Sequence, residues 1–131
     1  MKNLLFILFV LITFSCTKED TSCMDSACAI QGEWEWTSTY GSIAGATWTP
    51  ESTSMTKLLS IDENEISFFE NDILVDTKEY SVFESDTILG GDISYTFLSY
   101  GTDTRLLDLN DDEMNISDLC ADCYQDYYER K

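Results

Sequence analysis

The chain contains no histidine, the side chain that most often acts as a general base, activates a nucleophile or binds a metal near neutral pH. Carboxylates are abundant instead, with 25 aspartates and glutamates against seven lysines and arginines. In so acidic a chain some carboxylates approach one another by chance, so a carboxylate pair does not indicate catalysis. Gly90-Gly91 is typical of a turn, because a phosphate-binding loop needs a longer glycine-rich pattern. We therefore expect no enzymatic activity and no cofactor.

Two acidic segments, residues 62–65 and 110–113, carry the oxygen ligands that calcium prefers. Neither segment has the glycine and the ligand spacing of an EF-hand loop. Solvated turns between strands explain these residues more simply, and we expect no metal site there.

The five cysteines are the remaining reactive groups, and Cys16 stands apart because it follows an apolar run. The other four form an even set, as expected for disulfides in an oxidising compartment. A four-thiolate zinc site is the alternative, although the compartment makes it less expected. A redox-active pair is also disfavoured, because neighbouring aspartates would raise a thiol pKa. The four candidates for disulfides are Cys23, Cys28, Cys120 and Cys123.

The N-terminus is predicted to carry an export signal, because Lys2 is followed by an apolar run, Leu4–Phe14, too short to span a bilayer. The sequence ending this run, Thr13-Phe14-Ser15-Cys16, resembles the lipobox of bacterial lipoproteins. The resemblance implies cleavage after residue 15 and acylation of Cys16, including a palmitate-type amide chain. The alternative is ordinary signal cleavage with Cys16 left as a free thiol. Several buried acyl chains, each methylene contributing about 0.8 kcal/mol, would anchor the protein to a membrane without a spanning helix.

The residues after Cys16 bear on location and partners. Lys18-Glu19-Asp20 is similar to the signal that sends some Gram-negative lipoproteins to the outer face of the outer membrane. We expect an outer-membrane lipoprotein, with exposure at the cell surface as the finer expectation. The formal net charge of −18 makes nucleic acid an unfavourable partner, because its phosphates would be repelled.

We divide the chain into a signal peptide (1–15), a polar lipidated tether (16–29) and one domain (30–131). The domain shows short apolar segments with a period of two, separated by turn residues, and no useful helical repeat. A long loop, Gly41–Ser54, interrupts the pattern and contains Trp48, expected as a plug of the domain or a lid over it. The eight expected strands are Gln31–Tyr40, Met55–Ile61, Glu65–Phe69, Ile73–Phe83, Ile93–Tyr100, Arg105–Leu109, Met114–Leu119 and Cys123–Arg130.

Eight consecutive antiparallel strands left open would expose two unpaired edges, and closing the first strand onto the last removes both. The sequence therefore predicts an all-β, eight-stranded antiparallel up-and-down barrel. In this barrel Cys28 and Cys123 would lie at opposite ends, roughly 25 Å apart and beyond the reach of a disulfide. Of the three pairings that four cysteines allow, this geometry favours Cys23–Cys28 and Cys120–Cys123.

The first strand organises the domain. Trp34 and Trp36 are two residues apart, so in an extended strand both indoles point to one face and the intervening glutamates to the other. The order Gly32-Glu-Trp34-Glu-Trp36, then Thr49-Pro50-Glu51, then Tyr127-Tyr128-Glu129-Arg130 resembles the small bacterial lipocalin-like lipoproteins over most of residues 30–131. The resemblance implies that Arg130 packs on Trp34 and closes the floor of the barrel.

The resemblance also implies a barrel that binds a small apolar or amphipathic molecule, while the alternative is a filled barrel that serves as a structural or interaction module. Burial favours filling in so small a domain, because an empty interior forfeits stabilising contacts. Trp34 and Met114 are expected to point inward with the residues that would line a ligand site. These candidates are Trp36, Trp48, Phe68, Tyr80, Tyr95, Phe97 and Tyr128.

Overall fold

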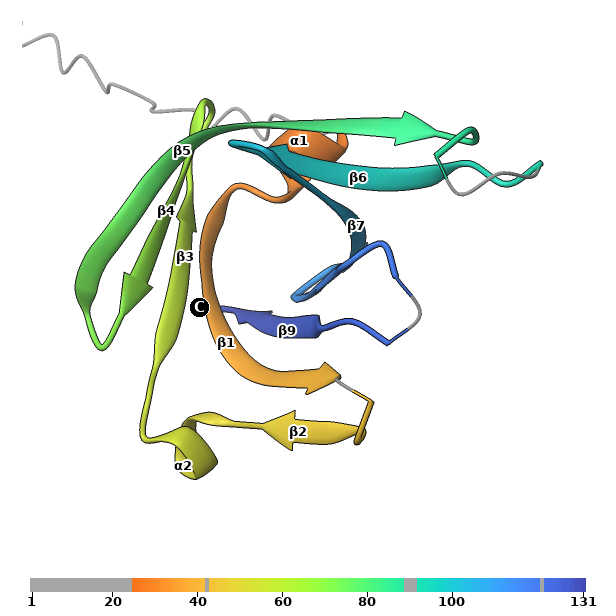
Figure 1. The fold of residues 1–131 in the computed structure, drawn as a ribbon. Coiled ribbons are helices and arrows are strands. Elements are labelled where there is room, and N and C mark those ends of the chain that lie inside the picture. Colours follow the sequence, from red (N-terminus) through yellow and green to blue (C-terminus); the bar gives the residue numbers. More distant parts are fainter. Residues whose placement is uncertain (1–24, 42, 89–91, 121) are drawn as a thin grey trace, which may run out of the picture.

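The computed structural model describes residues 25–41, 43–88, 92–120 and 122–131. Several predictions fall outside the described residues: the signal peptide, acylation at Cys16, the sorting signal after it, the disulfide partner Cys23 and the turn Gly90-Gly91. Within this part of the chain, nine strands form one sheet and two short helices flank it (Figure 1). The elements are α1 (Ser26–Ala29), β1 (Gly32–Gly41), β2 (Ala46–Trp48), α2 (Pro50–Thr53), β3 (Lys57–Ile61), β4 (Glu65–Glu70), β5 (Ile73–Ser85), β6 (Tyr95–Tyr100), β7 (Asp103–Asn110), β8 (Glu113–Ser117) and β9 (Gln125–Arg130).

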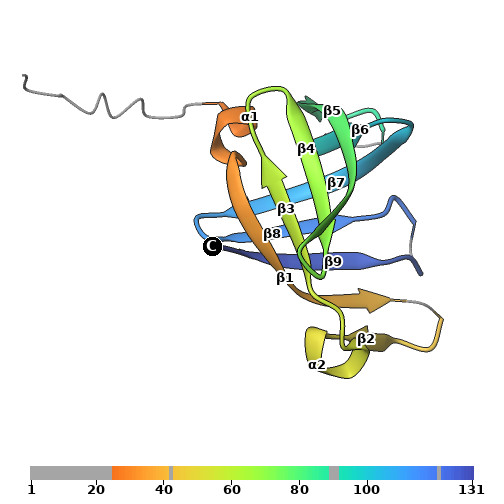
Figure 2. The ribbon, with the colours of Figure 1, turned by 90° about the vertical axis from the view of Figure 1, so that its left-hand side faces the viewer.

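The predicted eight-stranded antiparallel up-and-down barrel is confirmed. Each strand from β3 to β9 pairs with its neighbour in sequence, and β1 pairs with both β3 and β9, which closes the sheet. The ninth strand, β2, pairs only with the end of β1, at residues 39–41. Figure 2 shows the consequence: α1 covers one end of the barrel, while β2 and α2 lie at the other.

Two predictions for the irregular segments were wrong. The expected loop 41–54 contains β2 and α2. Thr49 caps α2 by a capping box with Ser52, and Pro50 occupies the first turn, where its missing N–H costs nothing. The expected tether already forms α1 at its end, with Asp25 as the N-cap. The helices α1 and α2 have four residues each and β2 has three, so all three are too short for a periodic pattern to reveal.

A β-bulge divides β1 into two halves. Trp36 pairs with Tyr128 and Ser38 pairs with Tyr127, so Thr37 is an extra residue on β1. The extra residue reverses the alternation, because each further residue then points to the face opposite to that expected. Trp34 and Trp36 face inward before the bulge, and Thr39 and Gly41 are buried after it.

The covered end of the barrel is filled with apolar side chains. Trp34 is fully buried, and its indole Nε1 donates to the carbonyl oxygen of Ile30 at 2.7 Å. The expected inward positions of Trp34 and Met114 are found here. The buried core consists of Ile30, Trp34, Trp36, Leu59, Ile61, Ile66, Leu98, Tyr100, Leu107, Met114, Ile116 and Tyr128.

Arg130 closes this end, as the resemblance implied. Its guanidinium lies over the Trp34 ring at 4.1 Å from the centroid. It also donates to the carbonyl oxygens of Gln31 at 2.8 Å and Ala29 at 2.9 Å, which ties the last strand to the segment before the first. Gly32 allows this approach, because a Cβ there would lie 2.9 Å from Nη1 and the residue has a φ of +130°.

A two-residue hairpin turn at Asn71-Asp72 joins β4 to β5. Both residues have positive φ, 50° and 64°, as the type I′ turn of a two-residue hairpin requires. The Asn71 side chain also accepts from the backbone N–H of Thr56 at 2.9 Å. Asparagine and aspartate tolerate this conformation, so the turn forms without glycine.

The predicted inward face of β6 was wrong. Leu98 and Tyr100 belong to the buried core, which places Tyr95 and Phe97 on the opposite face of the strand. Phe97 is fully buried there, stacked on Phe83 with ring centroids 5.6 Å apart. The strand carries apolar residues on both faces, so its sequence alone does not identify the inner one. The pairing of Val82 with Leu98 sets the orientation.

Replacing Arg130 by methionine should lower the free energy of unfolding by about 2 kcal/mol, because the cation–π contact and two hydrogen bonds to carbonyl oxygens are lost. Urea unfolding followed by tryptophan fluorescence measures the loss. Lys131→Met is the matched control: its exposed ammonium lies 3.6–3.7 Å from two glutamates, and its loss should cost under about 0.5 kcal/mol. Equal effects of the two variants would show that Arg130 has no special role in closing the barrel.

Candidate functional site

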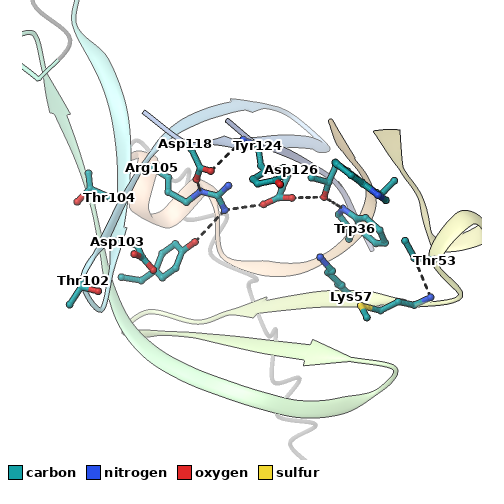
Figure 3. Close-up of a pocket in the computed structure, with 14 residues that line it drawn as sticks. Trp36, Thr53, Lys57, Thr102, Asp103, Thr104, Arg105, Asp118, Tyr124 and Asp126 are labelled. Carbon is teal, nitrogen blue, oxygen red and sulfur yellow. Dashed lines mark hydrogen bonds and ion pairs between the residues drawn. The ribbon is translucent and has the colours of Figure 1, made fainter. Parts of the chain in front are cut away.

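The open end of the barrel contains a cavity of about 780 Å³. Its walls come from β1, β2, β3 and β9, from the β6–β7 hairpin and from the segment after β8 (Figure 3). The barrel is thus neither wholly filled nor wholly hollow: one end is a packed core and the other is a cavity. The residues lining it are Trp36, Thr39, Trp48, Thr53, Met55, Lys57, Tyr100, Thr102, Asp103, Thr104, Arg105, Asp118, Tyr124 and Asp126.

Aromatic rings form much of the apolar lining. Trp36 lies at the junction with the core, where it is 4% exposed. Trp48 pairs with Thr39 through β2 and is half-buried against the core, so it forms part of the cavity wall rather than a plug through the barrel. Its ring contacts Tyr124 at 5.8 Å between centroids. The short β2 strand therefore adds an aromatic wall to the open end.

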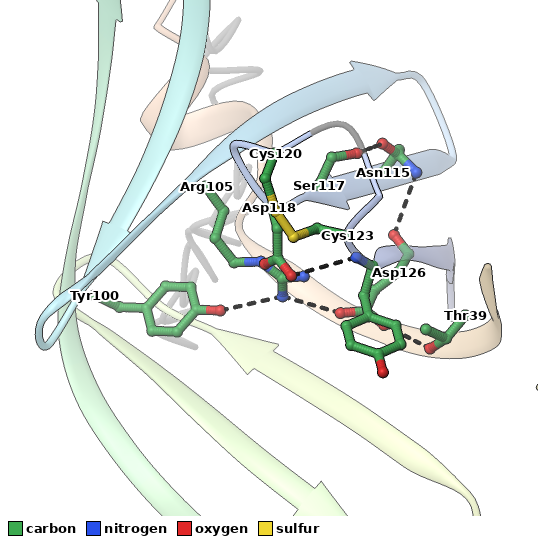
Figure 4. A network of polar contacts seen from close by, with 10 residues as sticks. Thr39, Tyr100, Arg105, Asn115, Ser117, Asp118, Cys120, Cys123 and Asp126 are labelled. Carbon is green, nitrogen blue, oxygen red and sulfur yellow. Dashed lines mark hydrogen bonds and ion pairs between the residues drawn. A yellow bond between two sulfur atoms is a disulfide. The ribbon is translucent and has the colours of Figure 1, made fainter. Parts of the chain in front are cut away.

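A polar network lies beside these rings, centred on Arg105. The Arg105 guanidinium donates to Asp126 at 2.9 Å and to the Tyr100 hydroxyl at 3.5 Å through Nη1 (Figure 4). Its Nε lies 2.8 Å from Asp118 Oδ1, but the N–H does not point at an acceptor, so this contact is an ion pair rather than a hydrogen bond.

The network continues to the core through two side chains of β1. The Thr39 hydroxyl donates to Asp126 Oδ1 at 2.5 Å, and the Trp36 indole donates to Thr39 Oγ1 at 2.9 Å. The β-bulge at Thr37 makes this possible, because it turns Thr39 toward the interior. Each half of β1 thus contributes one residue to a continuous chain of hydrogen bonds.

Arg105 keeps its charge at all ordinary pH values. Burial opposes the charged form, but the hydrogen bond to Tyr100 and the negative charge of Asp126 outweigh it, so the pKa of Arg105 is raised. Burial also raises the pKa of Tyr128, which lies beneath the network in the core. Arg105 is therefore a fixed positive charge at the centre of the network.

A disulfide holds one wall of the cavity. Cys120 and Cys123 are bonded, as predicted, within the turn that joins β8 to β9. The turn begins at Asp118 and ends at Tyr124, and the Asp118 N–H donates to the Tyr124 carbonyl oxygen at 3.0 Å. The disulfide thus keeps two cavity residues together. The other predicted bond, Cys23–Cys28, has a partner outside the described residues and stays a prediction.

Lys57 is the second cation of the cavity. Its ammonium lies 4.6 Å from the centroid of the Trp36 ring. Among the described residues no carboxylate lies within ion-pair distance of it, whereas Lys78 is paired with Asp76 at 3.2 Å. Lys57 stands on β3 and Arg105 on β7, which are separated by three strands on either side of the closed barrel.

The structure brings together two of the predicted ligand-lining residues, Trp36 and Trp48. Phe68 and Tyr128 pack in the core, and Tyr95 and Phe97 lie on the other face of β6. Tyr80 lies at the covered end, where its hydroxyl donates to the carbonyl oxygen of Asp62 at 2.7 Å. Burial raises the pKa of Tyr80. None of these five residues lines the cavity. They were chosen as apolar residues expected to point inward, and this criterion does not tell which end of the barrel stays open.

The polar residues of the site were not predicted, although part of the signal was present. Arg105 has the same parity as the apolar Leu107 and Leu109, and Asp126 has the parity of Tyr124 and Tyr128. Alternation along β7 and β9 thus places both charges on the inner face. Two opposite charges expected on the inner face of one barrel indicate a buried ion pair. Thr39 had no such signal, because the bulge that turns it inward is not visible in the sequence.

The first acidic segment is a tight turn. Asp62 accepts the backbone N–H groups of Asn64 and Glu65, both at 2.8 Å, and these bonds lower its pKa. Across the described ranges, no group of carboxylates and cysteines is arranged to hold a metal ion.

Fold and site together define a closed antiparallel barrel with a packed floor and an open aromatic and charged cavity. Comparison of the chain with known families, characterised proteins and solved structures finds no match. Neither described helix has the length and apolar content needed to cross a bilayer.

Replacing Arg105 by methionine should lower the free energy of unfolding by about 3 kcal/mol, because it leaves two half-buried carboxylates facing each other without a counter-charge. Chemical unfolding at pH 7 measures the loss. The double variant Arg105→Met/Asp126→Asn should recover part of it, because it removes one uncompensated charge while the amide oxygen can still accept from Thr39. Additive losses in the double variant would contradict the network.

Proposed function

We propose that this protein is a lipocalin-like lipoprotein of the outer membrane that captures a small amphipathic molecule in the open end of its barrel. The observation that carries the proposal is the cavity. Its volume of about 780 Å³ lies within the range of about 300–1,000 Å³ that is usual for small-molecule sites. Aromatic walls and a few placed polar groups are the usual lining of such sites.

The filled-barrel alternative, a structural or interaction module, would need the apolar interior to continue to both ends. The core instead stops at Trp36 and Tyr100, and polar side chains that already satisfy one another take its place. A pre-formed ion network keeps its shape without a ligand, so it supports a standing cavity rather than a collapsed one. The cavity therefore favours ligand capture over the module with a filled interior.

The direction of the barrel agrees with anchoring at Cys16. Strand β1 begins at the covered end, beside α1, and ends at the cavity beside β2. A chain anchored just before α1 would be tethered through the covered end, which leaves the cavity facing away from the point of attachment. We include the acyl anchor and the surface location in the proposal on this basis, together with the signal sequence and the residues that follow Cys16.

The proposal is non-enzymatic and involves no nucleic acid. The described residues that line the cavity include no histidine, serine or cysteine, and Asp118 and Asp126 are engaged with Arg105. The net charge of −18 disfavours polyphosphate partners. Capture, storage or transfer of a small molecule needs none of these groups.

Binding of N-phenyl-1-naphthylamine, an uncharged aromatic probe that becomes fluorescent in apolar sites, tests the proposal on the full-length chain. Trp48→Ala should weaken the affinity about tenfold, because it removes one aromatic wall from the cavity. Tyr127→Ala is the matched control: Tyr127 is 38% exposed on β9 and does not line the cavity, so the affinity should stay unchanged. Native mass spectrometry of protein purified from its own membrane should detect a co-purified small molecule.

If a folded wild-type chain bound no probe and carried no small molecule, the ligand-capture proposal would be overturned. The interaction-module alternative would then stand.

A further inference from the structure

The cavity has free hydrogen-bond donors and few free acceptors. Arg105 uses Nη1 for two hydrogen bonds, while Nη2 has no partner among the described residues (Figure 3). Lys57 contacts the Trp36 ring and no carboxylate of the described chain. An ammonium has three N–H donors, and a ring face satisfies only one direction. Both cations of the cavity therefore keep N–H groups available to a ligand.

The inner carboxylates, by contrast, are already satisfied. Asp126 accepts from Thr39 and from Arg105 on its two oxygens. Asp118 has one oxygen 2.8 Å from Arg105 and accepts the Tyr124 N–H on the other at 3.4 Å. A cationic ligand would have to compete with Arg105 for them. Asp103, at the β6–β7 turn, is the remaining carboxylate among the described lining residues, and it is exposed to solvent.

The acidity of the whole protein opposes an anionic ligand, but mainly at long range. At physiological ionic strength exposed charges are screened over about 8 Å, whereas a contact inside a partly enclosed cavity is screened much less. The local arrangement of donors should therefore decide which head group binds. Lys57 has no carboxylate partner in the described ranges, although the sequence holds a large excess of carboxylates.

We propose that the ligand of this cavity carries an acidic head group, such as a carboxylate, phosphate or sulfonate, on an apolar or aromatic body. Lys57 binds the head group, with Arg105 Nη2 as a second donor on the opposite wall. Trp36 and Trp48 contact the body. This inference rests on the proposed function and adds the chemical class of the ligand to it.

Two probes that differ in one group test the inference. Anilinonaphthalene sulfonate and N-phenyl-1-naphthylamine share the same ring system, and only the first carries an acid. In the full-length chain, Lys57→Met should weaken sulfonate binding about tenfold while the affinity for the neutral probe changes less than about twofold. Lys57→Arg keeps the charge and should retain most of the sulfonate affinity.

Lys78→Met is the matched control. Lys78 also lies over aromatic rings, 5.8 Å from the centroids of Phe68 and Tyr100, but it does not line this cavity and is paired with Asp76. The control removes the same unit of charge, so any general field effect is equal in both variants. It should change the affinity for either probe by less than about twofold. Far-ultraviolet circular dichroism and urea unfolding confirm that each variant is folded.

The outcomes separate the two proposals. Equal effects of Lys57→Met and Lys78→Met on sulfonate binding, or tighter sulfonate binding after Lys57→Met, would overturn the inference that the ligand carries an acidic head group. Binding of the neutral probe would in that case still support the proposed capture site. If the folded wild type bound neither probe and carried no co-purified small molecule, the capture site itself would be overturned, and the inference with it.

Discussion

The pairing of the first strand with the last is the constraint on which the rest of the structure depends. Backbone hydrogen bonds between β1 and β9 place Trp34 beside Arg130 at one end and Thr39 beside Asp126 at the other. One ladder therefore positions both the residue that closes the core and the carboxylate that orients the polar network. It also removes the two free edges that an open sheet of this size would expose. Closure thus supports the stability of the domain and the geometry of its cavity together.

The interior of the barrel is filled by different kinds of side chain at its two ends. The covered end buries aromatic and aliphatic side chains, which supply the hydrophobic stabilisation of a small domain. The open end uses charges that satisfy one another, with Arg105 between two aspartates. Such a cluster adds little net stability, but it holds its geometry because each broken contact would leave a half-buried charge unpaired. The result is a cavity that persists without being packed.

The sequence predicts the barrel well because the information for it is local and repeated: short alternating segments separated by acidic turns mark the strands. The closing pair is also visible, because Arg130 of the last strand pairs with Trp34 of the first. The site is harder to predict. The side chains of β6 are apolar on both faces, so Phe97 and Leu98 compete for the interior and only the register with β5 decides. Thr39 depends on a one-residue bulge, and Trp48 on a three-residue strand. The inward position of Arg105 and Asp126 could be predicted from the alternation along β7 and β9, but a criterion limited to apolar residues does not select them.

The bulge at Thr37 also has a consequence for how this barrel can change. Before the bulge, the even-numbered residues Trp34 and Trp36 point into the packed core. After the bulge, the inward positions are odd-numbered, and Thr39 points into the cavity. Substitutions in the second half can therefore alter the shape of the ligand chamber without disturbing the tryptophan that supports the fold. A single inserted residue thus divides the strand into a half that packs in the core and a half that lines the cavity. New binding preferences can therefore evolve while the core stays the same.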